Sequence, residues 1–189
     1  MANTDAPMGF RPRRLINGGT VPSANSYPLA SAYGSNIFTG DAVVLTSGKL
    51  AVATDSSTGL LGVFAGCQYV DTNGSVVFSP YWPASTATSG SVDAVGYVYD
   101  NPDTVFEAQT DSGVDFVLAT HNLTLADLIS THSGSTVTGQ SKQELRVGTD
   151  GDEQFLVLQL IDRPGNAVGT HAKVECRIKD HRLSSTYSA

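Results

Sequence analysis

Long apolar runs are missing from this chain of 189 residues. No stretch approaches the roughly 18 consecutive apolar residues that a membrane-spanning helix needs. The first residues also lack the apolar core of a secretory signal peptide. The sequence therefore predicts neither contact with a membrane nor secretion, and we expect the protein to originate in the cytoplasm.

Cysteine is scarce as well, with only Cys67 and Cys176. Each falls on the apolar phase of an alternating, strand-like run, where a free cysteine usually behaves as a small buried hydrophobe. We therefore expect two reduced thiols in the core and no disulfide.

Basic residues are few, 11 against 18 acidic ones, which gives a formal net charge of −7. The charge is unevenly distributed along the chain. Residues 1–40 carry Arg11, Arg13 and Arg14 against Asp5, whereas residues 41–115 are strongly acidic. Binding of nucleic acid needs a face rich in lysine and arginine that displaces counterions from phosphates. The charge pattern therefore argues against a nucleic-acid partner.

The motifs of common enzymes are absent too. The chain has no G-x-S-x-G elbow, no phosphate-binding P-loop and no G-x-G-x-x-G turn. Its four histidines occur in polar, turn-like surroundings, and we expect them at the surface: His121, His132, His171 and His181. No cysteine and histidine have the spacing of zinc ligands. The sequence predicts no catalytic residue, no metal site and no cofactor.

Two acidic clusters are candidates for a catalytic site and a cation site. Asp100, Asp103 and Glu107 include carboxylate pairs of the type used in acid–base hydrolysis, although Asn101-Pro102 between them is a turn signal. A hydrolase that uses these carboxylates is therefore a remote alternative. The loop at 150–153, DGDE, has the ligand types of a Ca²⁺ site but lacks the pattern of an EF-hand. Whether it binds a cation stays open.

What the chain does contain, from about residue 37 onward, is a series of short β-type runs separated by turn residues. Asn73-Gly74 supplies the positive φ angles of a tight hairpin between two apolar runs, and a second hairpin is expected around Ser47-Gly48. This pattern of short strands and turns predicts an all-β fold, a sandwich or barrel-like single domain.

Three further elements are predicted downstream. Residues 122–130 have leucines on one side, which indicates one short helix that leans on the sheet. Residues 155–161 are almost wholly apolar, as in a central strand. Residues 173–179 alternate, with Val174, Cys176 and Ile178 facing the core and the charged residues between them facing outward.

The first 36 residues have a different character, with three arginines, several prolines and glycines, and no hydrophobic period. We expect an extended N-terminal arm over 1–36 and a β-rich body over 37–189. Apolar side chains are spaced along the arm like anchors, and arginine suits acidic groups on a partner. The predicted partner-binding residues of the arm are Phe10, Arg11, Arg13, Arg14, Leu15, Ile16 and Tyr27.

A last candidate is the stretch FSPYWPAST, which places Phe78, Tyr81 and Trp82 beside two prolines at the end of a hairpin. One interpretation is a loop that caps the core. The other is a binding surface, because tryptophan and tyrosine are enriched where protein surfaces meet.

Several stretches together resemble the head decoration, or cement, proteins of tailed bacteriophages. The opening MANTDAPMGFRPRR is similar to the polar lead into Gly-Phe-Arg-Pro found in that family. The stretches GDAVVL, GLLGVFAGCQYVD, VYDNPDTVFEAQTD, GQSKQEL and IDRPGNAVGTHAKVECRIKDH resemble the family's β-rich body.

The resemblance implies a non-enzymatic structural protein on the capsid exterior of the virion, assembled in the host cytoplasm. Such a protein bridges neighbouring subunits of the major capsid protein, and we expect it to form a homo-oligomer, a dimer or a trimer. The alternative is a phage tail or host-attachment protein that binds a glycan through Tyr81 and Trp82.

Overall fold

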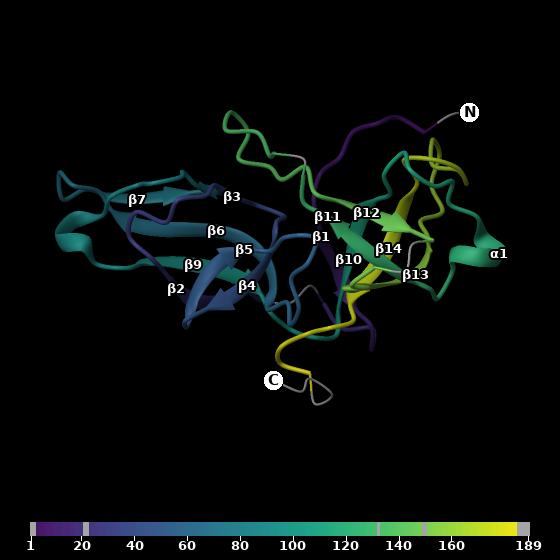
Figure 1. Ribbon diagram of the computed structural model, residues 1–189, viewed down its shortest axis with the longest axis horizontal. Coiled ribbons are helices and arrows are strands. Elements are labelled where there is room, and N and C mark those ends of the chain that lie inside the picture. The colour runs from purple at the N-terminus through teal and green to yellow at the C-terminus, as the bar shows by residue number, and fades with distance from the viewer. Residues whose placement is uncertain (1–2, 21–22, 132, 149–150, 185–189) are drawn as a thin grey trace.

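The computed structural model describes residues 3–20, 23–131, 133–148 and 151–184, which form an elongated molecule with β-sheet toward both ends of its long axis (Figure 1). The regular structure is almost entirely β, with one 3-10 turn at Ser89–Ser91 and one short helix, α1 (Leu118–His121). The predicted all-β class is therefore confirmed. The strands are β1 (Arg11–Leu15), β2 (Asn25–Leu29), β3 (Ile37–Phe38), β4 (Ala42–Thr46), β5 (Lys49–Val52), β6 (Gly62–Val70), β7 (Val76–Ser79), β8 (Tyr81–Trp82), β9 (Ala94–Tyr99), β10 (Thr104–Gln109), β11 (Leu125–Ile129), β12 (Glu144–Val147), β13 (Phe155–Leu160) and β14 (Lys173–Ile178).

Sheet 1 has the order β1-β10-β14-β13-β11-β12, with antiparallel neighbours, and it curls back on itself. Thr110, directly after β10, bridges Leu145 of β12, and the N–H of Asp111 donates to the Leu145 carbonyl at 2.8 Å. Strands β1 and β12 therefore follow one another along the same edge of β10, and the sheet closes as in a small barrel. The predicted central strand at 155–161 is confirmed as β13, which lies between β14 and β11.

Sheet 2 has the order β2-β9-β6-β4-β5, and β7 also pairs with β6. Both hairpins predicted from turn residues are present: β4 pairs with β5 across Ser47-Gly48, and β6 pairs with β7 across Asn73-Gly74. Ser47 and Gly48 have φ +52 and +78, in the left-handed region that the first turn requires. In the second hairpin Gly74 has φ +85, but the positive φ predicted for Asn73 is wrong. The Asp71 N–H donates to the Ser75 carbonyl at 2.9 Å, so that loop also contains Thr72. A separate two-stranded ribbon joins β3 to β8.

Each sheet covers its own cluster of buried apolar side chains. The first cluster fills the curled sheet 1 and includes Phe106, Phe155 and Cys176, and the second lies against sheet 2 and includes Phe64 and Trp82. Ala42 of β4 and Val63 of β6 belong to the first cluster, so sheet 2 contributes to the core of sheet 1. Cys67 and Cys176 are both buried and free, as predicted.

The predicted helix over 122–130 is wrong. The short helix α1 ends at His121, and most of the segment is strand β11, paired with β12 on one side and β13 on the other. Ala126 and Leu128 point into the core while Asp127 between them does not, which is the period of a strand. A segment this short has little helical stability of its own, so its pairing with β12 and β13 decides its conformation.

Neither α1 nor the 3-10 turn has the length or apolarity to cross a membrane, and the described residues contain no other helix.

The segment predicted to be an extended N-terminal arm contributes a strand to each of the two sheets. Strand β1 lies along β10 in sheet 1, and strand β2 lies along β9 in sheet 2. A segment with no hydrophobic period can still form edge strands, because its backbone pairs with strands supplied by the rest of the chain. Strands β1 and β2 of this segment therefore lie along the protein's own two sheets.

Candidate functional site

Most of the residues predicted to anchor the arm on a partner are used inside the protein. The ring of Phe10 is buried and stacks on Phe155. The hydroxyl of Tyr27 donates to Asp100 at 2.5 Å, and Leu15 is half-buried. Only Arg11, Arg13 and Ile16 among the predicted arm residues are exposed.

The arginines find their acidic partner in the same chain. Arg14 Nη2 lies 2.7 Å from Glu175 Oε2, and Arg13 Nη1 lies 3.3 Å from Glu175 Oε1. Burial alone would raise the pKa of Glu175, but the hydrogen bond from Arg14 and the two positive charges outweigh it, and the net pKa is lowered. The outward face predicted for β14 is thus covered by the charged end of β1. The sequence led us to expect acidic groups of another protein beside these arginines, but Arg13 and Arg14 contact Glu175 of the same chain.

The acidic residues of the hydrolase alternative have separate structural partners. Asp100 is buried and accepts hydrogen bonds from Tyr27 and Asn25, while Glu107 pairs with Arg163 at 2.8 Å. Asp103 is exposed in the turn between β9 and β10. The structure therefore gives Asp100 and Glu107 separate partners and leaves Asp103 exposed.

The described part of the acidic loop forms an ion pair, and two of the four histidines are buried. In the loop at 150–153, Glu153 pairs with Lys179 at 2.9 Å, and Asp150 lies outside the described residues. The expectation of surface histidines is wrong for His121 and His181, which are buried against Phe116 and beside Leu60 respectively. His171 is half-buried, and His132 lies outside the described residues.

The aromatic stretch at 78–82 splits into an inner and an outer part. Trp82 is fully buried, its ring meets Tyr69 edge-on at 5.3 Å, and its Nε1 donates to the Tyr33 carbonyl at 3.3 Å. Tyr81 is half-buried and stacks on Phe38. Phe78, by contrast, is 72% exposed. The core-capping interpretation thus holds for Trp82, and Phe78 is the aromatic side chain that faces solvent.

Phe78 belongs to an apolar surface that the sequence analysis missed, here called the sheet-edge patch. Phe78 and Val95 both lie opposite Gln68, and Val70 lies opposite Val76, so these side chains share one face of sheet 2. Val92, in the turn before β9, is 69% exposed beside them. The patch consists of Val70, Val76, Phe78, Val92 and Val95. Alternation of Val76 and Phe78 along one hairpin strand was the available signal.

A hollow of about 150 Å³ opens within the sheet-edge patch, lined by Val70, Val92 and Val95 together with the polar Gln68 and Thr88. An ion pair between Lys49 and Asp93, 2.8 Å apart, adjoins it. An apolar floor with a charged margin has the composition of a protein-binding surface. Strand β7 pairs with β6 alone among the strands of the described ranges, so its other edge is also open to a partner strand.

A second, smaller apolar surface lies at the opposite end of the molecule and is here called the α1 patch: Val117, Leu118 and Leu123. The buried His121 holds the residues on either side of α1 in place. The N–H of Val117 donates to Nδ1 of His121 at 3.0 Å, and Thr124 Oγ1 donates to the His121 carbonyl at 2.9 Å. In Figure 1, α1 stands at one end of the long axis, whereas β7 lies toward the other.

Comparison with known proteins adds no relative: no family model, no curated protein and no solved structure matches the chain.

Proposed function

We propose that the protein is a non-enzymatic structural protein that binds the outside of a tailed-phage capsid and bridges neighbouring subunits of the major capsid protein. The observation that carries the proposal is a pair of exposed apolar patches, one beside β7 and one at α1. These two elements lie toward opposite ends of an elongated molecule (Figure 1). A bridging protein needs two contact surfaces that cannot both fall on one partner subunit. Contiguous exposed apolar surface marks sites of protein association.

The chemistry of the sheet-edge patch supports a protein as its partner. Phe78 offers a large apolar side chain, and the neighbouring hollow receives one from the other protein. The acidic charge of −7 disfavours contact with the packaged genome, so the proposal includes no nucleic acid and no membrane. In this proposal the protein decorates the virion exterior after assembly in the host cytoplasm, and the α1 patch contacts either a second shell subunit or another copy in a dimer or trimer.

The structure changes which residues carry the proposed contact. Docking through residues 1–36, as expected from the sequence, would require β1 and β2 to leave the two sheets and Phe10 to leave the core. We therefore place the contact on the folded body. The glycan-binding alternative loses its main aromatic surface, because Trp82 is fully buried and Tyr81 stacks on Phe38.

The experiment is co-sedimentation of the full chain with shells of the major capsid protein from the same genome. Phe78→Asp places a charge at the centre of the sheet-edge patch, and we expect at least a tenfold loss of shell binding, on the order of the energy of a hot-spot side chain. The matched control is Val137→Asp, at a valine that is 94% exposed outside both patches.

The two variants separate the proposal from nonspecific effects of charge. Wild type and Val137→Asp are expected to bind at a ratio near one copy per shell subunit. Because Phe78 is exposed, its replacement leaves the fold intact, which unfolding in urea checks. Equal binding of Phe78→Asp and wild type, or no binding of wild type, would contradict the proposal.

A further inference from the structure

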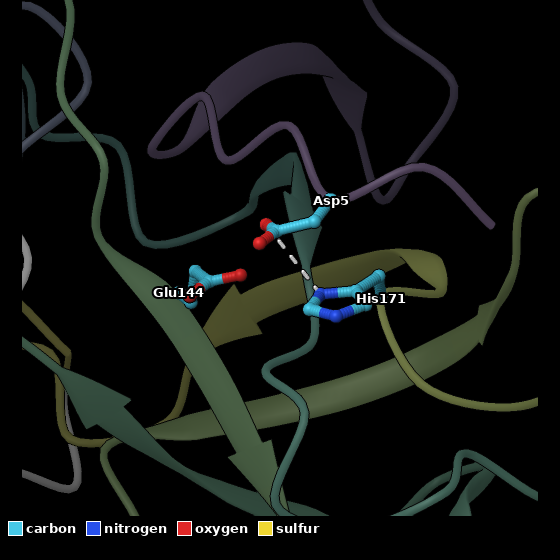
Figure 2. Close-up of side chains that lie close together, drawn as sticks. All are labelled: Asp5, Glu144 and His171. Carbon is cyan, nitrogen blue, oxygen red and sulfur yellow. Dashed lines mark ion pairs between the residues drawn. The ribbon is translucent and has the colours of Figure 1, made fainter.

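A cluster of three side chains with metal-ligand chemistry lies in sheet 1, away from both patches. Asp5 comes from the segment before β1, Glu144 begins β12, and His171 lies two residues before β14. Figure 2 shows the three side chains turned toward one another. One ligand atom from each lies within 4.8 Å of the others, and Asp5 Oδ1 is 3.6 Å from His171 Nδ1.

A fully buried amide, that of Gln109 at the end of β10, points into the same cluster. Its Nε2 lies 3.4 Å from Asp5 Oδ1, 3.4 Å from Glu144 Oε1 and 3.2 Å from His171 Nδ1. These separations are at or beyond the long end of ordinary hydrogen bonds, and an amide nitrogen has two hydrogens to offer three acceptors. One buried amide nitrogen therefore faces a potential ligand atom from each of the three side chains at the point where they meet.

Carboxylates also gather at this point, because the charges of Asp5 and Asp111 both act on Glu144. Asp111 is itself paired with Arg146 at 2.7 Å, so that arginine is already engaged. A cation between the ligands would offset the repulsion between the carboxylates and use the lone pairs that Gln109 shares.

The ligands are held in place by groups that do not belong to the cluster. Asn3 Nδ2 donates to the carbonyls of Ala167 and Thr170, both at 2.8 Å, and its Oδ1 accepts from the Ala167 N–H at 2.8 Å. These bonds fix the segment that carries Asp5 against the loop that carries His171. His171 itself has φ +54, a strained backbone conformation for a residue with a side chain.

We propose that Asp5, Glu144 and His171 form a site for a divalent transition-metal ion of the zinc type, which fastens the N-terminal segment to sheet 1. Two carboxylates and one imidazole are a donor set suited to Zn²⁺, which commonly binds three protein ligands and one water. Asp5 is exposed, so an ion can reach the cluster from solvent. Calcium fits less well because it takes six to eight oxygen ligands.

The proposal does not depend on capsid binding, and its test uses the purified full chain alone. After dialysis against a chelator, Zn²⁺ is titrated by calorimetry and the melting temperature is followed in parallel. We expect one Zn²⁺ per chain and a rise in melting temperature that grows with Zn²⁺ concentration, because the ion binds the folded state. Ca²⁺ at the same concentrations is expected to leave the melting temperature unchanged.

The decisive variants are Asp5→Asn and His171→Gln, with Asp103→Asn as the matched control at an exposed aspartate outside the cluster. Each ligand variant is expected to weaken Zn²⁺ binding at least tenfold while the control binds like wild type. Asp5 is exposed, so its replacement does not threaten the fold. Failure of wild type to take up Zn²⁺, unchanged affinity in both ligand variants, or an equal response to Ca²⁺ would overturn the assignment.

Discussion

Phe10 stacks face to face on Phe155, with ring centroids 4.4 Å apart and planes 3° from parallel. Phe10 comes from the segment before β1 and Phe155 from the central strand β13, so one pair of rings joins the beginning of the chain to the core of sheet 1. The backbone supports the same contact, because the Phe10 N–H donates to the Gly40 carbonyl at 2.8 Å. The N-terminal residues therefore belong to the folding unit.

Phe10→Ala is expected to lower the free energy of unfolding by about 3–5 kcal/mol, the usual cost of emptying the site of a buried phenylalanine. Urea unfolding followed by Trp82 fluorescence measures the change. Phe78→Ala is the matched control, since Phe78 is exposed and its loss is expected to cost less than about 0.5 kcal/mol. Similar values for the two variants would show that Phe10 is not a core residue.

Glu175→Gln tests the ion pairs between β14 and β1. The pKa of Glu175 is lowered in the folded protein, so its stabilising effect is present above its ordinary pKa and is lost as the pH falls through the folded value. At about pH 7 we expect the variant to be about 1–2 kcal/mol less stable, a modest figure because Arg13 and Arg14 are partly exposed. Once the pH falls below the lowered pKa of Glu175, the stabilities of the two proteins are expected to converge. A constant difference across the pH range would contradict this.

Asp41→Asn tests a carboxyl group whose effect on stability has the opposite pH dependence from that of Glu175. Burial raises the pKa of Asp41 to about 6, against the hydrogen bonds from Ser141 and from the Phe38 N–H. A raised carboxyl pKa means that the folded state loses stability as the pH rises from about 4 to about 6, by about 2–3 kcal/mol. The asparagine variant is expected to lack that loss. Chemical unfolding of both proteins across this window measures it, and parallel profiles would refute the assignment.

Thiol labelling tests the burial of the two cysteines. Burial raises the pKa of Cys67 to about 12, and burial together with the charge of Glu175 raises that of Cys176 further. The reactive thiolate is therefore scarce at about pH 8. Neither cysteine is expected to react with a disulfide reagent in the native protein, and both are expected to react in urea. Rapid labelling of the native protein at either position would be inconsistent with the structure.

Leu123→Asp tests the second contact of the proposed bridge. Leu123 has φ +57, a conformation that aspartate tolerates better than leucine, so the substitution is compatible with the fold. Bridging predicts that this variant still binds shells through the sheet-edge patch but no longer raises their resistance to denaturant. Full stabilisation of the shell by Leu123→Asp would remove the α1 patch from the proposal.

Local signals in the sequence were sufficient for the hairpins. Ser47-Gly48 fixes both the turn and the register of its strands, because Thr46 and Lys49 on either side of it form a pair. Asn73-Gly74 locates the second hairpin, but the register there, with Val70 opposite Val76, comes from a longer loop. The same reasoning failed at 122–130, where the partners of β11 lie far along the chain in β12 and β13. A short segment with apolar residues on one side is compatible with either structure until its neighbours are known.

The candidate sites depended still more on distant pairing. Nothing near Trp82 in the sequence shows that β8 pairs with β3, which buries the indole. Asp5, Glu144 and His171 have no characteristic spacing, since sheet closure and the N-terminal segment bring them together. Exposed valines such as Val92 read as ordinary strand-flanking residues. Spacing rules detect sites built within one segment, and these sites are built from several.

The position of β1 has a consequence for how the protein is made. The ribosome synthesises β1 before its neighbour β10, and β10 in turn pairs with β14, which is made later still. Sheet 1 therefore cannot be completed until β14 has left the ribosome, and pairing over such separations is slow. Newly made chains pass through a stage with unpaired strand edges, which are prone to aggregate. Yield in a host cell is thus expected to depend on the rate of synthesis and on chaperones as much as on final stability.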